Sequence, residues 1–175
     1  PGSVGMEACF VNLVEPGDTV IVCINGVFGG RMKENVERCG GAALVVEDEW
    51  GRAIDPSKVE QALRETPGAK IVAFVHAETS TGARSTVDLV RREIGPGPVL
   101  VVDSVTGLGG IPLEVDKWGI DVCFSGTQKC LSVPPGLAPI TFSPRAAQAV
   151  ADRKTAVQSW YLDVSMIRKY WEEGD

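Results

Sequence analysis

The sequence predicts an α/β fold, with a mostly parallel sheet that carries helices on both faces. Short apolar runs, rich in β-branched residues, alternate along the chain with stretches of helical pattern. The apolar runs are continuous instead of alternating with polar residues, which is typical of strands buried on both faces of a parallel sheet. With 175 residues, 44% of them hydrophobic, the chain is long enough for one such domain with a real core.

The same patterns place six strands and six helices. The apolar runs are expected as strands at residues 19–24, 42–46, 70–76, 99–102, 121–124 and 138–142. The stretches with helical pattern are expected as helices at residues 6–14, 27–38, 56–64, 86–94, 144–154 and 164–172.

Turn-forming residues separate these elements in order along the chain. They lie at residues 1–5, 15–18, 25–26, 40–41, 66–68 and 95–98, where glycine, proline, asparagine and aspartate gather. Pro56 suits the first turn of the helix expected at 56–64. No linker between domains is evident, so a single domain is predicted.

Composition argues against several functional classes. The net charge is −6 without a basic run, which disfavours partners such as nucleic acid or an anionic membrane surface. No apolar run approaches the roughly 18 residues of a membrane helix. The five cysteines lack C-x-x-C spacing and are expected as buried thiols in a reducing compartment. His76 is the only histidine, so neither a metal site nor a Ser–His–Asp arrangement is predicted.

Three polar residues each follow the end of an expected strand: Thr79, Asp103 and Lys129. Ligands of parallel sheets bind at the carboxyl ends of strands, so we expect these side chains to converge. Partial burial of Lys129 would favour its neutral amine, a nucleophile that forms Schiff bases with carbonyls. The alternatives are a solvated loop lysine for Lys129, and a helix cap or magnesium ligand for Asp103.

Two further features suit a planar ligand that carries a phosphate. Gly2 and Ser3 open the first expected helix, where free N–H groups favour an anion, although a plain helix start is the alternative. Phe28 follows a strand end and could stack on a ring or belong to the core. A carboxylate such as Asp103 can keep a pyridine nitrogen protonated while Lys129 supplies the Schiff base, which is the protein's part in pyridoxal phosphate (PLP) chemistry.

Six segments, in order along the chain, carry a family resemblance. They are residues 2–8, 15–18, 25–31, 76–82, 102–110 and 125–136, the last including Gln128-Lys129 and Pro134-Pro135-Gly136. Through them the chain resembles the class V, fold-type I PLP-dependent aminotransferases. The most similar group is that of the alanine–glyoxylate, serine–glyoxylate and serine–pyruvate aminotransferases.

The resemblance implies a role for each matched position. Lys129 would form the internal aldimine with PLP, and Asp103 would bind the pyridine nitrogen. The remaining cofactor-binding positions would be Phe28 and Val105 on the two ring faces, Thr79 near the ring edge, and Gly2, Ser3, Val4 and Gln128 around the phosphate. Pro1 departs from the small residue usual in the family and has no N–H to donate.

The family fold has about seven strands in the large domain of a homodimer, with the active site at the interface. Family members are about twice as long as this chain. Residues 1–175 are therefore expected to be the PLP-binding large domain, without the N-terminal segment and the small C-terminal domain. The latter carries the arginine that binds the substrate carboxylate. A cytoplasmic location is expected, with peroxisome or mitochondrion as alternatives.

The implied reaction moves an amino group from alanine or serine to glyoxylate or pyruvate, so the partners are an amino acid and a 2-oxo acid. One alternative is a class V PLP lyase such as a cysteine desulfurase, although those enzymes have histidine where Gln128 stands. Another is a large-domain fragment without catalysis. A dinucleotide-binding domain is disfavoured because no G-x-G-x-x-G follows the first strand.

Overall fold

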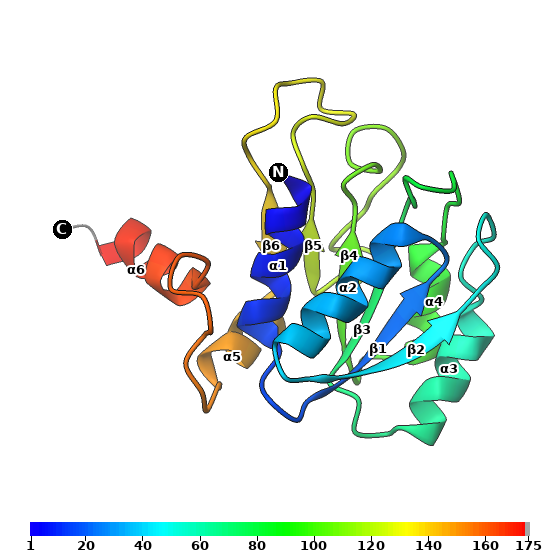
Figure 1. Cartoon of the computed structure of the whole chain (residues 1–175), viewed down its shortest axis with the longest axis horizontal. Coiled ribbons are helices and arrows are strands. Elements are labelled where there is room, and N and C mark those ends of the chain that lie inside the picture. The colour runs from blue at the N-terminus through cyan, green and yellow to red at the C-terminus, as the bar shows by residue number, and fades with distance from the viewer. Residues whose placement is uncertain (174–175) are drawn as a thin grey trace.

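The computed structural model describes residues 1–173 as a sheet between two layers of helices (Figure 1). The strands are β1 Thr19–Ile24, β2 Ala42–Glu47, β3 Ile71–Val75, β4 Val99–Asp103, β5 Val122–Phe124 and β6 Ile140–Phe142. The helices are α1 Gly2–Leu13, α2 Val27–Arg38, α3 Pro56–Glu65, α4 Val87–Ile94, α5 Pro144–Ala151 and α6 Val164–Glu173.

The sheet has the order β2-β1-β3-β4-β5-β6, with five parallel strands and β6 antiparallel to β5. The predicted fold class is confirmed, and the six strands coincide with the six apolar runs. The resemblance implied about seven strands, one more than the described residues form. The carboxyl ends of the parallel strands share one edge, where the loops after β1, β3, β4 and β5 meet.

Helices cover both faces of the sheet, as predicted, because alternate residues of each strand face opposite layers. On one face, residues such as Val22 and Ala73 pack with α1, α2 and α5. On the other face, residues such as Cys23 and Phe74 pack with α3 and α4. Helix α1 is buried at nine of its twelve positions, so it is a central element of the core.

The start of α1 differs from the prediction of a turn over residues 1–5, because the helix already begins at Gly2. The carbonyl of Pro1 accepts hydrogen bonds from the N–H groups of Val4 at 2.9 Å and Gly5 at 3.3 Å. The glycine at position 2 serves close packing, since a Cβ there would lie 2.6 Å from Cγ2 of Val105.

Helix α5 ends at Ala151, three residues before its predicted end at Lys154. Tertiary hydrogen bonds hold the chain beyond it out of the helix. Nη1 of Arg153 donates to the carbonyls of Asn12 at 3.1 Å and Val14 at 2.9 Å. The N–H of Lys154 donates to a carboxylate oxygen of Glu15 at 2.8 Å.

All five cysteines are free thiols, but only four of them are buried. Cys130 is exposed, contrary to the prediction, because it lies in the loop that projects beyond β5. Within residues 1–173, no helix has both the length and the apolar character needed to cross a bilayer.

Candidate active site

A cavity of about 190 Å³ lies at the carboxyl edge of the sheet. The residues that line it are Pro1, Gly2, Ser3, Met6, Phe28, Arg31, Asp103, Val105, Gln128 and Lys129. They come from Pro1 and α1, from α2, from the end of β4 and from the loops that follow β4 and β5. Residues that are up to 128 positions apart in the sequence therefore surround one space, as the strand-end argument predicts.

Asp103 is the last residue of β4 and has only 2% of its surface exposed. The pKa of Asp103 is raised to about 7, chiefly because burial disfavours the charged carboxylate. The negative charge of nearby Glu78 raises this pKa further, whereas the hydrogen bond from the Val105 N–H, at 2.8 Å, lowers it. The carboxyl group is therefore poised between its charged and neutral forms near neutral pH. A protonated ring nitrogen placed against Asp103 would keep its carboxyl group in the ionised form.

Lys129 lies in the loop after β5, and the expectation that it is partly buried is wrong. Its side chain is exposed, as are all residues from 129 to 137. This loop stands beyond the end of the sheet, next to the N-terminus of α1 (Figure 1). Burial within this chain therefore gives no reason for Lys129 to be nucleophilic, and its position beside Asp103 in the cavity wall carries the argument instead.

The N-terminal end of α1 forms a second wall of the cavity. The first N–H groups of a helix have no partner inside it, so those of Gly2 and Ser3 can bind an anion. Within residues 1–173, Oε1 of Gln128 is buried without a hydrogen-bond partner. A Cβ on Gly126 would come within 2.9 Å of this oxygen and 3.1 Å of the Gly2 nitrogen, so only glycine leaves the space open. The amide of Gln128 offers a donor as well as an acceptor.

Two apolar side chains, Phe28 and Val105, also line the cavity. The guanidinium of Arg31 lies 4.6 Å from the centroid of the Phe28 ring, on the helical turn after it. These features fit a planar, phosphate-bearing cofactor with a ring nitrogen: apolar groups for the ring, a buried carboxyl for the nitrogen and helix N–H groups for the phosphate.

Two predicted residues do not line this cavity. Val4 is 40% exposed on α1. Thr79 is exposed in the loop after β3, where its hydroxyl forms a hydrogen bond with that of Thr106. Thr106 follows Val105 directly, so Thr79 still lies beside one wall of the cavity.

Sequence reasoning missed Glu78 and Arg31. Glu78 is 1% exposed and accepts hydrogen bonds from the first turn of α2. Its place three residues after the end of the buried strand β3 is a signal that could have drawn attention to it. Helical spacing is the signal for Arg31. It lies three residues after Phe28, a predicted ring-stacking residue, and residues i and i+3 of a helix share a face.

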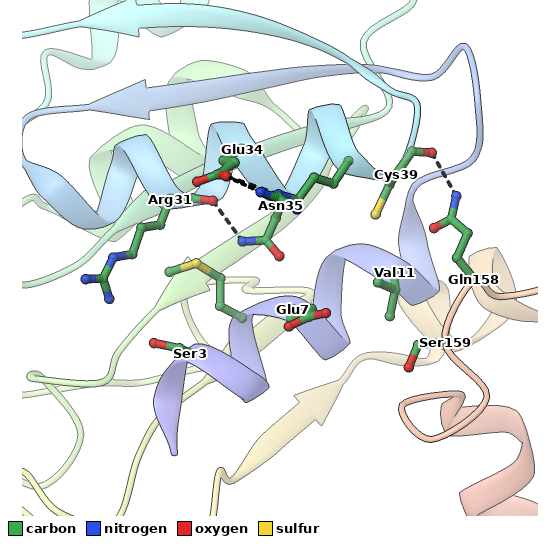
Figure 2. Close-up of a pocket in the computed structure, with 11 residues that line it drawn as sticks. Ser3, Glu7, Val11, Arg31, Glu34, Asn35, Cys39, Gln158 and Ser159 are labelled. Carbon is green, nitrogen blue, oxygen red and sulfur yellow. Dashed lines mark hydrogen bonds and ion pairs between the residues drawn. The ribbon is translucent and has the colours of Figure 1, made fainter.

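A larger cavity, of about 560 Å³, lies between α1 and α2 and shares Ser3, Met6 and Arg31 with the first (Figure 2). Its polar groups are largely occupied with one another. Arg38 donates a hydrogen bond to the Glu34 carboxylate at 2.7 Å. Figure 2 shows the Asn35 side-chain amide donating to the Arg31 carbonyl and the Gln158 side-chain amide donating to the Cys39 carbonyl. Among residues 1–173, no group of three or more His, Cys, Asp or Glu side chains is placed to hold a metal ion.

The sequence model of the family "Aminotransferase class-V" matches residues 3–168. The chain belongs to this family. It is 37% identical to the (S)-ureidoglycine–glyoxylate transaminase of Bacillus subtilis, over 97% of this chain and 45% of that protein. The crystal structure of an alanine–glyoxylate aminotransferase from Nostoc sp. has a TM-score of 0.91 at 41% identity, over 97% of this chain and 45% of that one. This class V aminotransferase chain thus spans less than half the length of these relatives.

A cysteine desulfurase from Thermococcus onnurineus is a more distant neighbour of this class V chain. Its TM-score is 0.67 at 18% identity, over 82% of this chain. At that identity the similarity concerns the fold alone. The resemblance inferred from the six segments, to the glyoxylate-dependent aminotransferases, is confirmed by the family match and by the two relatives above.

Proposed function

We propose that this chain is the PLP-binding large domain of an aminotransferase that moves an amino group from alanine or serine to glyoxylate or pyruvate. The observation that carries the proposal is that Asp103 and Lys129 line one cavity beside the N-terminal end of α1. When bound there, PLP supplies an electron sink for the carbanion at the substrate α-carbon.

The residues of this chain have distinct tasks in the proposal. Asp103 would bind the ring nitrogen and keep a proton on it, because the pairing with a cation favours the carboxylate. Lys129 would be the point of covalent attachment, and once the substrate amine has displaced it, its Nζ would take the proton from the substrate α-carbon and pass it to the cofactor, which keeps the amino group. Phe28 and Val105 would pack on the two faces of the ring.

The remaining polar groups bind the phosphate in this proposal. The N–H groups of Gly2 and Ser3 would donate to it at the positive end of the α1 dipole, and Gln128 would supply its amide. Val4 would contribute to the phosphate site through its place in the same first turn. Thr79, in the loop beside Val105, would instead form a hydrogen bond near the ring edge.

The names of the two relatives support glyoxylate as acceptor, because both include it while their amino donors differ. The exposure of Lys129 supports a site that groups outside this chain complete. We place those groups in a partner subunit of a homodimer and in a C-terminal domain with a carboxylate-binding arginine. Four buried free thiols fit a reducing compartment, and the cytoplasm is our choice over peroxisome and mitochondrion.

Covalent labelling tests the proposal directly. Protein mixed with PLP is expected to give a yellow absorption band, and borohydride reduction followed by peptide mapping should place the label on Lys129. Lys129→Arg should lose the label, because a guanidinium does not form the Schiff base. Lys117→Arg, a control at a side chain that is 72% exposed, should keep it.

The result that contradicts the proposal is a folded sample with no band, or with label scattered over surface lysines. The chain would then be a non-catalytic domain. In protein that includes the segments outside residues 1–175, amino-group transfer to glyoxylate should be measurable by formation of glycine with alanine or serine as donor.

A further inference from the structure

Helix α2 begins without a capping side chain of its own. Its N-cap is Gly26, which has no side chain to accept a hydrogen bond. The first N–H groups of a helix have no partner inside it, and leaving them unpaired in a buried place is costly. In α2 these groups belong to Val27, Phe28 and Gly29, and Phe28 lines the cavity with Asp103 and Lys129.

The acceptors for these groups come from the loop after β3, about 50 residues further along the chain. The hydroxyl oxygen of Ser80 accepts from the N–H of Val27 at 3.0 Å. Oε2 of Glu78 accepts from the N–H groups of Phe28 at 3.1 Å and Gly29 at 3.4 Å. Oε1 of Glu78 accepts from the N–H of Ser80 at 3.1 Å and from its hydroxyl at 2.7 Å.

Space at this junction is reserved for the Glu78 side chain. Glu78 is 1% exposed, and a Cβ at position 26 would lie 2.3 Å from its Cγ. A negative charge at the positive end of the α2 dipole is also favourable. Each carboxylate oxygen of Glu78 accepts from two donors. A glutamine at position 78 would replace one of these oxygens with an NH₂ group, which would face other donors and could not accept their hydrogen bonds.

We propose that Glu78 is a positioning residue that fixes Phe28 against the cavity that holds Asp103 and Lys129. The role of Phe28 as a wall for the cofactor ring rests on the proposed function above. The cap itself does not rest on it, because its contacts lie entirely within this chain.

A double-mutant cycle in the full chain tests the link to Phe28, with the PLP dissociation constant measured by absorbance. Glu78→Gln is expected to raise the constant about tenfold, because it breaks hydrogen bonds to a charged group. In a Phe28→Ala background the same change should have almost no further effect. Glu49→Gln, at a side chain that is 81% exposed, is the matched control and should change nothing. If the two changes raise the PLP dissociation constant independently, so that the double variant shows the product of the two single effects, the proposal is overturned.

Hydrogen–deuterium exchange of the unloaded full chain provides a readout that needs no cofactor. A peptide over residues 24–32 should exchange faster in Glu78→Gln than in wild type, and unchanged exchange would overturn the proposal. If wild type fails to bind PLP but exchange does accelerate, the proposed function fails while the cap stands.

A milder variant covers the case in which Glu78→Gln does not fold. Ser80→Ala removes only the hydroxyl that bridges Val27 and Glu78. It should give smaller changes in the same direction in both exchange and PLP affinity. No change in either measurement would count against the proposal.

Discussion

Asp103 combines deep burial with a place at the end of a strand, where a ligand can reach its carboxyl group. Burial raises its pKa to about 7, from a usual value of 3.8. Between these two values the native state keeps a proton that the unfolded state has released. The contribution of Asp103 to stability is therefore lost as the pH rises through this window, the reverse of the usual behaviour of a paired carboxylate.

Asp103→Asn should remove this pH dependence. Asparagine keeps an oxygen for the Val105 N–H but does not titrate. We expect the free energy of unfolding of unloaded wild type, minus that of the variant, to fall by up to about 1.4 kcal/mol per pH unit between pH 4 and 7. Urea unfolding at several pH values measures this difference. A difference that stays constant or rises with pH would contradict the raised pKa.

The helix α1 shows how one element links the site to the rest of the chain. Its N-terminal end forms a wall of the cavity. At its C-terminal end, the Asn12 side chain donates to the Leu162 carbonyl at 2.7 Å and accepts from the Val164 N–H at 3.0 Å. Together with the bonds of Arg153 to the carbonyls of Asn12 and Val14, this fastens residues 153–164 to the helix end.

Arg153→Ala should destabilise the fold, because the last carbonyls of α1 lose a charged donor. We expect a loss of about 1–3 kcal/mol in the free energy of unfolding, measured with urea. Arg52→Ala removes an arginine that is 76% exposed and 3.9 Å from its acidic partner, and serves as control. Equal effects of the two changes would show that the bonds of Arg153 to α1 contribute nothing special.

At the scale of the whole molecule, the two ends of the parallel strands have different roles. The cavity lies at the carboxyl ends of the parallel strands, whereas an ionic cluster around the buried Asp121 side chain lies at their opposite ends. Oδ2 of Asp121 accepts from Arg91 and Arg145, each at 2.5 Å, and from the Leu100 N–H at 2.8 Å. The cluster joins β4 and β5 to helices on both faces.

Asp121→Ala should cost about 3–5 kcal/mol of stability, because it leaves Arg91 buried without its partner. Burial by itself raises the pKa of Asp121, but the Arg145 and Leu100 hydrogen bonds and the Arg91 charge outweigh it, so the pKa is lowered. The contribution is thus present above the usual pKa of 3.8 and lost as the pH falls through the native value.

Urea unfolding at neutral and acid pH should show the wild-type advantage at neutral pH alone. Asp116→Ala, at an exposed position, is the control. A variant as stable as wild type at neutral pH would contradict a stabilising role for the cluster.

Much of this architecture could be predicted from the sequence because its signals are local. Each strand is a continuous apolar run, and Asp103 and Lys129 each follow one, so their convergence needed only the rule for parallel sheets. The caps of α2, the early end of α5 and the Asp121 cluster join residues that are distant in the sequence, and no local pattern reports them. The exposure of Lys129 could not be read locally either, because it depends on where the loop after β5 projects.

The strand order also bears on the sequence of events in which the sheet forms during synthesis. Once β2 has paired with β1, β3 joins the other side of β1, and each later strand then pairs with the strand before it, through to β6. Synthesis from the N-terminus therefore delivers the strands in the order in which the sheet can accept them. All pairings except that of β5 with β6 are parallel and non-local, which slows folding, so this orderly addition shortens the period in which an apolar edge is open. The cavity forms late, because it must wait for the loop that follows β5.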